Sequence, residues 1–157
     1  MPTRNPQELP HAGKIISFDV GSKTLGVATC DIGRKIASPH STIARVQWKK
    51  DKEKIRQIID AEKITCAVVG LPLNMSGELT SQTKSCISFA ENIENEFGFP
   101  VLLWDERLTT VAAESALFEQ RTGRQKRASK KDVKKKVDAV AASLILQGAI
   151  DALRFAQ

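Results

Sequence analysis

The chain has 157 residues, of which 41% are hydrophobic and 27% charged, and this length and composition suit one folded domain. No apolar run approaches the ~20 residues needed to cross a bilayer, and the first residues lack the apolar stretch of a secretory signal. We therefore expect a cytoplasmic protein without membrane contact. The three cysteines (Cys30, Cys66 and Cys86) form no C-x-x-C pair, and the only histidines are His11 and His40, which excludes most zinc sites. The sequence has neither a G-x-x-x-x-G-K-[ST] loop nor a G-x-G-x-x-G fingerprint, so carboxylates are the expected catalytic groups of any enzyme.

The net charge of +6 is concentrated in one segment, residues 121–136. This segment holds nine Lys or Arg side chains against one acid, which leaves a net charge of −2 for the rest of the chain. We expect a basic loop that binds nucleic acid, because each neutralised phosphate releases counterions and adds affinity. A solvated loop without a partner is the alternative. The side chains of this segment that we expect to contact nucleic acid are Arg124, Lys126, Arg127, Lys130 and Lys131.

Hydrophobic patterning predicts strands alternating with helices after an antiparallel start. The predicted strands are Lys14–Asp19, Leu25–Cys30, one near either Arg34–Ser38 or Thr42–Val46 with Pro39 between them, Thr65–Gly70 and Val101–Trp104. The predicted helices are Asp51–Lys63, Ser81–Phe97, Leu108–Glu119 and about Val133 to Leu153. This order indicates an α/β fold with a mixed sheet flanked by helices over residues 14–157, preceded by a flexible N-terminal extension of residues 1–13.

Acidic residues occupy three positions that suit chemistry. Asp19 ends the first predicted strand, and Asp105 and Glu106 follow a later one; ligands of open α/β sheets gather outside the carboxyl ends of strands. Asp138 lies early in the last helix among small apolar residues, where a charge is unfavourable unless it is paired or metal-bound. Turn formation by the strand-end acids and a macrodipole role for Asp138 are the alternatives. Converging carboxylates require a cation, and oxygen ligands suit Mg²⁺ or Mn²⁺, so the acids and the basic segment together predict metal-dependent phosphodiester cleavage.

Four segments of the chain resemble, in order, those of the YqgF/RuvX-type family: FDVGSKTLGVA (18–28), VVGLPLNMSGE (68–78), DERLTT (105–110) and DAVAASLIL (138–146). Members of this family are described as Holliday-junction resolvases and as nucleases that mature the 5′ end of precursor 16S ribosomal RNA. The resemblance implies a ribonuclease-H-like fold with a mixed five-stranded sheet, and a nuclease that depends on Mg²⁺ or Mn²⁺. It places the catalytic, metal-binding acids at Asp19, Glu106 and Asp138, and leaves open whether Asp105 is a further ligand.

The same resemblance implies supporting roles for residues around these acids. Lys23 would neutralise a phosphate, and Arg107 would either contact phosphate or pair with Asp105. Asn74 would line a loop beside the substrate, together with Gly70, Pro72 and Gly77, although ordinary turn chemistry explains that loop equally well.

The favoured function is a metal-dependent nuclease, a monomer or weak homodimer, that acts on structured RNA and matures the 5′ end of pre-16S rRNA. A Holliday-junction resolvase acting on branched DNA and a non-catalytic RNA-binding module of ribosome assembly are the alternatives. Two departures from the resembled families bear on the choice. Thr24 replaces a family arginine and so removes a phosphate contact, and Ala141 stands where RuvC-type resolvases carry a second helix acid. An ATP-binding relative of the actin/sugar-kinase group is disfavoured, because the chain lacks a second D-x-G loop and a second domain.

Overall fold

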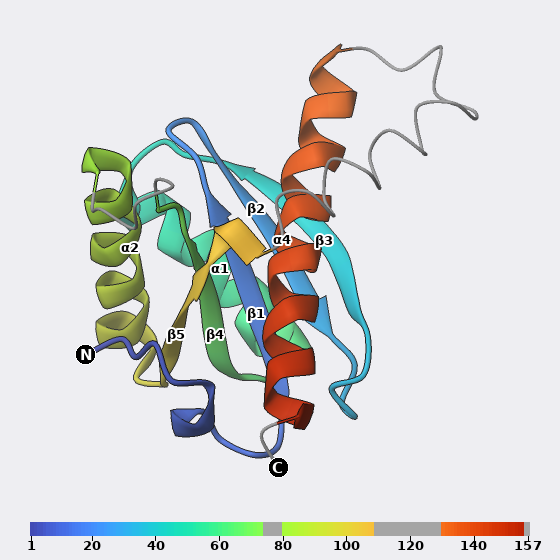
Figure 1. Cartoon of the computed structure of the whole chain (residues 1–157). Helices are drawn as coiled ribbons and strands as arrows, with labels where there is room; N and C mark the ends of the chain where they lie inside the picture. The colour runs from blue at the N-terminus through green and yellow to red at the C-terminus, as the bar shows by residue number, and fades with distance from the viewer. Residues whose placement is uncertain (74–79, 109–129, 156–157) are drawn as a thin grey trace.

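The mixed sheet at the centre of the molecule has five strands in the order β3-β2-β1-β4-β5, with helices on both faces (Figure 1). This computed structural model describes residues 1–73, 80–108 and 130–155. Strand β1 pairs antiparallel with β2, and β2 pairs antiparallel with β3. Strands β1 and β4 are parallel, as are β4 and β5. The predicted architecture, an antiparallel start followed by parallel strands, is therefore confirmed.

The elements lie close to their predicted positions. The strands are β1 (Lys14–Val20), β2 (Thr24–Cys30), β3 (Ala37–Ala44), β4 (Ile64–Leu71) and β5 (Val101–Asp105). The helices are α1 (Trp48–Glu62), α2 (Ser81–Phe97) and α4 (Lys130–Phe155), with short 3-10 helices η1 (Pro6–Glu8) and η2 (Glu106–Leu108). The helix predicted from Leu108 to Glu119 lies outside the described residues beyond its first position. Within the described ranges, no helix combines the length and the apolar character needed to span a bilayer.

Strand β3 differs from the two alternatives that the sequence offered. It is one continuous strand through Pro39, which pairs with Ala28 next to a register shift between Val27 and Ala28. A proline cannot donate to a strand ladder, but β3 is an edge strand, where a missing donor is tolerated. From the sequence alone Pro39 predicts a break between two short strands, because the pattern does not show that this strand lies at the edge of the sheet.

Two separate hydrophobic cores lie on the two faces of the sheet. The first contains side chains of α1 and α2 packed on the sheet. The second lies under α4, which crosses β1, β2 and β3 (Figure 1). Of the four apolar residues predicted to share the face of Asp138, Ala142, Ile145 and Ala149 are buried and Ala141 is half-buried. The Ser17 hydroxyl of β1 donates to the backbone oxygen of Ala142 at 2.7 Å and so joins α4 to the middle of the sheet.

Residues 1–13, predicted to be a flexible extension, contact the sheet at both ends of the segment. Thr3 forms a bridge at the open edge of β5: its N–H donates to Val101 O at 2.9 Å, and its oxygen accepts from Leu103 N at 2.7 Å. Leu9 is buried in the core under α4. The Arg34 guanidinium donates to the backbone oxygens of Pro10 and Gly13, each at 2.6 Å. The mobility of this segment in solution stays a prediction.

Candidate active site

Two of the predicted catalytic acids meet across the middle of the sheet. Asp19 is the second-last residue of β1, and Glu106 follows β5 directly. Although β4 separates these strands, the carboxyl groups of Asp19 and Glu106 are hydrogen-bonded to each other. Gly70 of β4 makes this contact feasible, because a Cβ at this position would collide with a carboxylate oxygen of Glu106 and with the side chain of Ile145. The glycine that the sequence assigned to a substrate loop therefore clears a path for Glu106 over β4.

Burial and mutual repulsion keep a proton on this pair. Burial raises the pKa of Glu106 to about 8, and the charge of Asp19 and the hydrogen bond to it act in the same direction. The pKa of Asp19 is also raised, first by burial and then by the charge of Asp138, while the hydrogen bond from Glu106 opposes this. Both pKa values are therefore raised, so the pair favours a state in which one of the two carboxyl groups is protonated.

The buried thiol of Cys86 lies near enough to the pair for the charges of Asp19 and Glu106 to act on it. Cys86 lies on α2, where it is buried and donates a long hydrogen bond to Val20 O at 4.0 Å. Burial and the neighbouring charges of Glu106 and Asp19 raise its pKa to about 12. A thiol so reluctant to ionise is not a nucleophile, so the chemistry of this site belongs to the carboxylates.

The third predicted acid, Asp138, is positioned by strand β2. The hydroxyl of Thr24 donates to Asp138 Oδ2 at 2.8 Å. Two residues further along β2, Gly26 allows the backbone of α4 to come close, because a Cβ there would overlap the carbonyl group of Asp138. Sequence reasoning treated Thr24 only as a lost phosphate contact. The available signal was the i, i+2 spacing of Thr24 and Gly26, which places both on one face of a strand.

The donor set suits a hard divalent cation, but the three carboxyl groups are not arranged as a finished metal site. Carboxylate oxygens are the ligands that Mg²⁺ and Mn²⁺ prefer. Among the residues that the structure describes, no three His, Cys, Asp or Glu side chains form a group that could hold a metal ion. Asp19 and Glu106 are closed on one another, and Asp138 is held by Thr24. The assignment of Asp19, Glu106 and Asp138 as catalytic metal ligands therefore stays a prediction, which requires the shared proton to leave.

The fourth candidate ligand, Asp105, is engaged elsewhere. The Arg107 guanidinium donates to Asp105 Oδ2 from Nε at 2.9 Å and from Nη2 at 2.6 Å, and the backbone N–H of Arg107 donates to Oδ1 at 2.9 Å. These bonds hold the pKa of Asp105 below its usual range. Of the two roles considered for Arg107, the structure shows the pairing with Asp105, and its contact with nucleic acid stays a prediction.

The remaining predicted nucleic-acid contacts are less defined. Lys23 is exposed in the turn between β1 and β2. Lys130 and Lys131 are the first two residues of α4, the helix that carries Asp138. Asn74, Arg124, Lys126 and Arg127 lie outside the described residues. These binding assignments stay predictions.

A family model described as RuvX, Holliday junction resolvase, matches residues 13–152. The chain belongs to the RuvX family. A relative from Sphingopyxis alaskensis is 43% identical over 92% of this chain and 91% of its own length. Another from Paracoccus denitrificans is 42% identical over 95% of this chain and 90% of its own length. Both relatives carry the name "Putative pre-16S rRNA nuclease".

Solved structures with a similar fold include nucleases that act on DNA junctions. T. thermophilus RuvC in complex with a Holliday junction substrate has a TM-score of 0.58 at 14% identity, over 92% of this RuvX-family chain and 97% of that chain. The yeast mitochondrial Holliday junction resolvase Ydc2 has a TM-score of 0.55 at 11% identity, over 95% and 82% of the two chains. At such low identity the likeness shows the fold alone. The ribonuclease-H-like fold expected from the sequence is confirmed.

The shared proton predicts an unusual pH dependence of stability. The folded pKa of Glu106, about 8, lies above its ordinary value of 4.5, so between these limits the folded state binds a proton that the unfolded chain has released. Without divalent metal, the free energy of unfolding should therefore fall as the pH rises from about 5 to 8, by on the order of 2 kcal/mol. Denaturant unfolding of the wild type and of Glu106→Gln measures this, and the variant should lose the decline. Glu53→Gln, on the exposed side of α1, is the control; an equal decline in Glu106→Gln would contradict the shared proton.

The hydrogen bond from Thr24 makes it a candidate positioning residue for Asp138. Thr24→Val removes the hydroxyl at nearly constant volume, and we expect Mn²⁺ affinity to fall about tenfold because Asp138 loses the donor that orients it. Isothermal titration calorimetry checks this, with Thr24→Ser expected to restore affinity. Thr29→Val is the matched control, since it makes the same change at the far end of β2. Unchanged Mn²⁺ affinity in Thr24→Val would show that Thr24 does not position Asp138 for metal binding.

Proposed function

We propose that this chain is a metal-dependent nuclease that cleaves phosphodiester bonds of structured RNA, with the 5′ end of pre-16S rRNA as its substrate. The observation that carries the proposal is the hydrogen-bonded Asp19–Glu106 pair with Asp138 beside it. Support for the RNA substrate comes from relatives at 42–43% identity that bear the pre-16S rRNA nuclease name. The basic chain, with a net charge of +6, suits a polyanion partner.

The chemistry follows from what these side chains do. Once deprotonated, Asp19 and Glu106 would offer carboxylate oxygens to a divalent cation, and Asp138, held by Thr24, would be the third group. Mg²⁺ or Mn²⁺ bound there would supply activation of a water molecule and stabilisation of the leaving oxygen of a phosphodiester. Burial of Asp19 and Glu106 limits water around their carboxylates, which would strengthen their hold on a cation.

The basic residues bind the nucleic acid backbone. In this proposal Lys23 and the segment 121–136 contact phosphates and hold the substrate in register without reading its sequence. Asn74 and Arg107 add contacts beside the site. The protein acts in the cytoplasm as a monomer or weak homodimer.

A second candidate is a resolvase that acts on branched DNA, which the description of the matching family model favours. It would use the same carboxylates on a different substrate. Ala141, one helical turn beyond Asp138 on α4, weakens the analogy with RuvC-type enzymes because it offers no second helix acid.

One experiment separates these functions. Purified wild type, Asp19→Asn and Asp138→Asn are incubated with precursor 16S rRNA and with a four-way DNA junction, each with and without Mn²⁺. We expect the wild type to cleave the RNA only with Mn²⁺ and both variants to fall to background while remaining folded, because each has lost a carboxylate ligand. Asp151→Asn is the matched control, since it removes a carboxylate from the same helix, where Asp151 accepts a hydrogen bond from Gln147 instead.

The outcomes are distinct. Full cleavage by Asp19→Asn or Asp138→Asn would contradict the carboxylate site. Cleavage of the junction and not of the RNA would favour the resolvase, and RNA binding by every protein without cleavage by any would indicate a non-catalytic binding module.

A further inference from the structure

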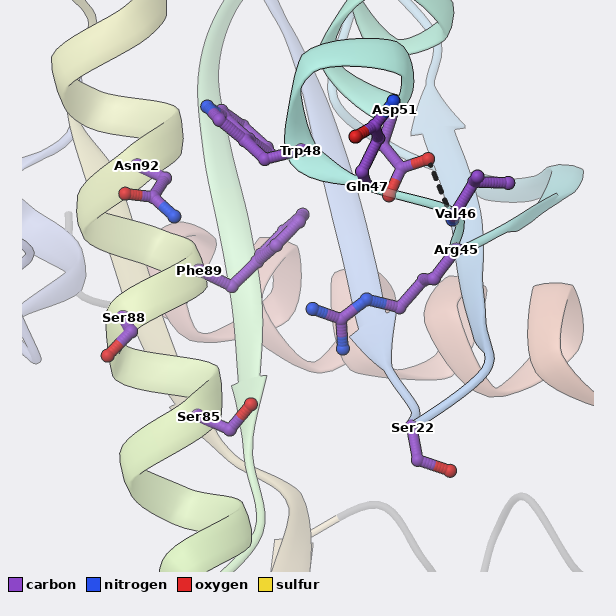
Figure 2. A pocket seen from close by; sticks show the side chains of 10 residues that line it. All are labelled: Ser22, Arg45, Val46, Gln47, Trp48, Asp51, Ser85, Ser88, Phe89 and Asn92. Atoms are coloured by element: carbon purple, nitrogen blue, oxygen red, sulfur yellow. Dashed lines mark hydrogen bonds between the residues drawn. The ribbon is translucent and has the colours of Figure 1, made fainter.

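A groove of about 510 Å³ lies between α1 and α2, on the face of the sheet opposite α4 (Figure 2). It is lined by the turn between β1 and β2, the connection from β3 to α1, the first turns of α1 and one side of α2. The lining residues that matter here are Ser22, Arg45, Trp48, Ser85, Phe89 and Asn92. None of the proposed catalytic carboxylates lines this groove.

The groove continues towards the carboxylate site. A second hollow of about 400 Å³ shares Ser22, Arg45 and Ser85 with it. This second hollow is also lined by Val20 and Gly21, the two residues that follow Asp19. The lining of the second hollow therefore begins at the residue that follows Asp19, at the end of β1 that carries the proposed catalytic acid.

Arg45 places a positive charge where the two hollows join. Its Nη1 donates to Gly21 O at 2.7 Å, and its guanidinium carbon lies 6.0 Å from the centre of the Phe89 ring. Figure 2 shows the guanidinium pointing across the groove towards α2. Asp51, the acid that lines the groove, accepts from Val46 N at 3.1 Å. Among the described side chains no carboxylate forms an ion pair with Arg45, so its other donors can serve an anion.

Farther along the groove, Trp48 of α1 and Phe89 of α2 lie beside polar side chains of α2. The Trp48 ring packs edge-on against Phe89 at 6.0 Å between centres, and Phe89 packs in turn against Phe18 at 5.2 Å. Trp48 is thereby fixed in place while part of its indole stays exposed. Ser85, Ser88 and Asn92 of α2 also line the groove and offer both hydrogen-bond donors and acceptors, and Figure 2 shows the Ser85 hydroxyl on the side that faces Arg45.

We propose that this groove is a subsite for one unpaired nucleotide next to the scissile phosphate. Arg45 binds the phosphate of that nucleotide, the indole of Trp48 stacks on its base, and Asn92 with the α2 serines bonds the edge of the base. This inference rests on the proposed nuclease function and specifies its substrate: a strand that is unpaired beside the cleavage point. A base inside a duplex cannot enter the groove, because it would first have to leave its stack.

Binding without cleavage tests the subsite. Fluorescence anisotropy in EDTA compares a short blunt RNA duplex with the same duplex carrying a few unpaired nucleotides. We expect the wild type to bind the extended duplex at least about fivefold more tightly, the range of one base stacked on an aromatic side chain. Arg45→Gln and Trp48→Leu should each reduce this ratio to near one.

Arg56→Gln is the matched control. Like Arg45, Arg56 lies over a phenylalanine ring, at 5.1 Å from the centre of Phe97. Arg56 is on α1, however, and pairs with Glu96 outside the groove. Its variant should keep the wild-type ratio. If Arg45→Gln fails to fold, Asn92→Ala, an exposed substitution in the groove, replaces it and should also lower the ratio.

A second readout follows Trp48 directly. The chain has two tryptophans, so Trp104→Phe leaves Trp48 as the sole indole, and a single-stranded oligonucleotide should quench its fluorescence where a blunt duplex does not. Equal affinity of the wild type for both duplexes, or an unchanged ratio in Arg45→Gln and Trp48→Leu, would overturn the subsite. Because no divalent metal is present, these results are independent of whether Asp19→Asn and Asp138→Asn lose cleavage.

Discussion

The carboxyl groups of Asp19 and Glu106 share a hydrogen bond in a place where burial withholds the water that would separate their charges. Two such groups resist ionising together unless a cation offsets the repulsion, and the pKa values of both are raised. Neighbouring residues keep the two carboxyl groups close together and buried. Gly70 clears the path over β4 for Glu106, and the charges of the pair raise the pKa of the buried Cys86. In the proposed function, the pair would exchange its proton for a divalent ion.

The two faces of the sheet contribute different parts of the proposed site: one carries Asp138 and the other a groove. On one face, α4 comes close to β2 at Gly26 and so brings Asp138 within reach of Thr24 and of the charge of Asp19. On the other face, α1 and α2 leave a groove that ends beside Gly21. The proposed catalytic site thus lies at the edge of the sheet, between the helix that carries Asp138 and the two helices that form the proposed nucleotide subsite.

Much of this could be predicted from the sequence, because strands buried on both faces and amphipathic helices leave clear periodic patterns, and acids that follow strands meet at one edge. The contact between Thr24 and Asp138 could not, since it depends on which strand α4 crosses. Neither could the role of Gly70, which follows from the register of β4 against its neighbours. Pro39 within β3 and the pairing of Asp105 with Arg107 likewise depend on edge position and local geometry.

The central claim is that Asp19, Glu106 and Asp138 bind one divalent ion together once the shared proton has gone. Crystals soaked in Mn²⁺ above pH 8, with data collected at the manganese edge, test it most directly. We expect an anomalous peak about 2.1 Å from a carboxylate oxygen of each residue, the spacing expected for hard oxygen ligands. A peak that touches only one of the three, or an Asp19–Glu106 pair that stays closed without any peak, would contradict it.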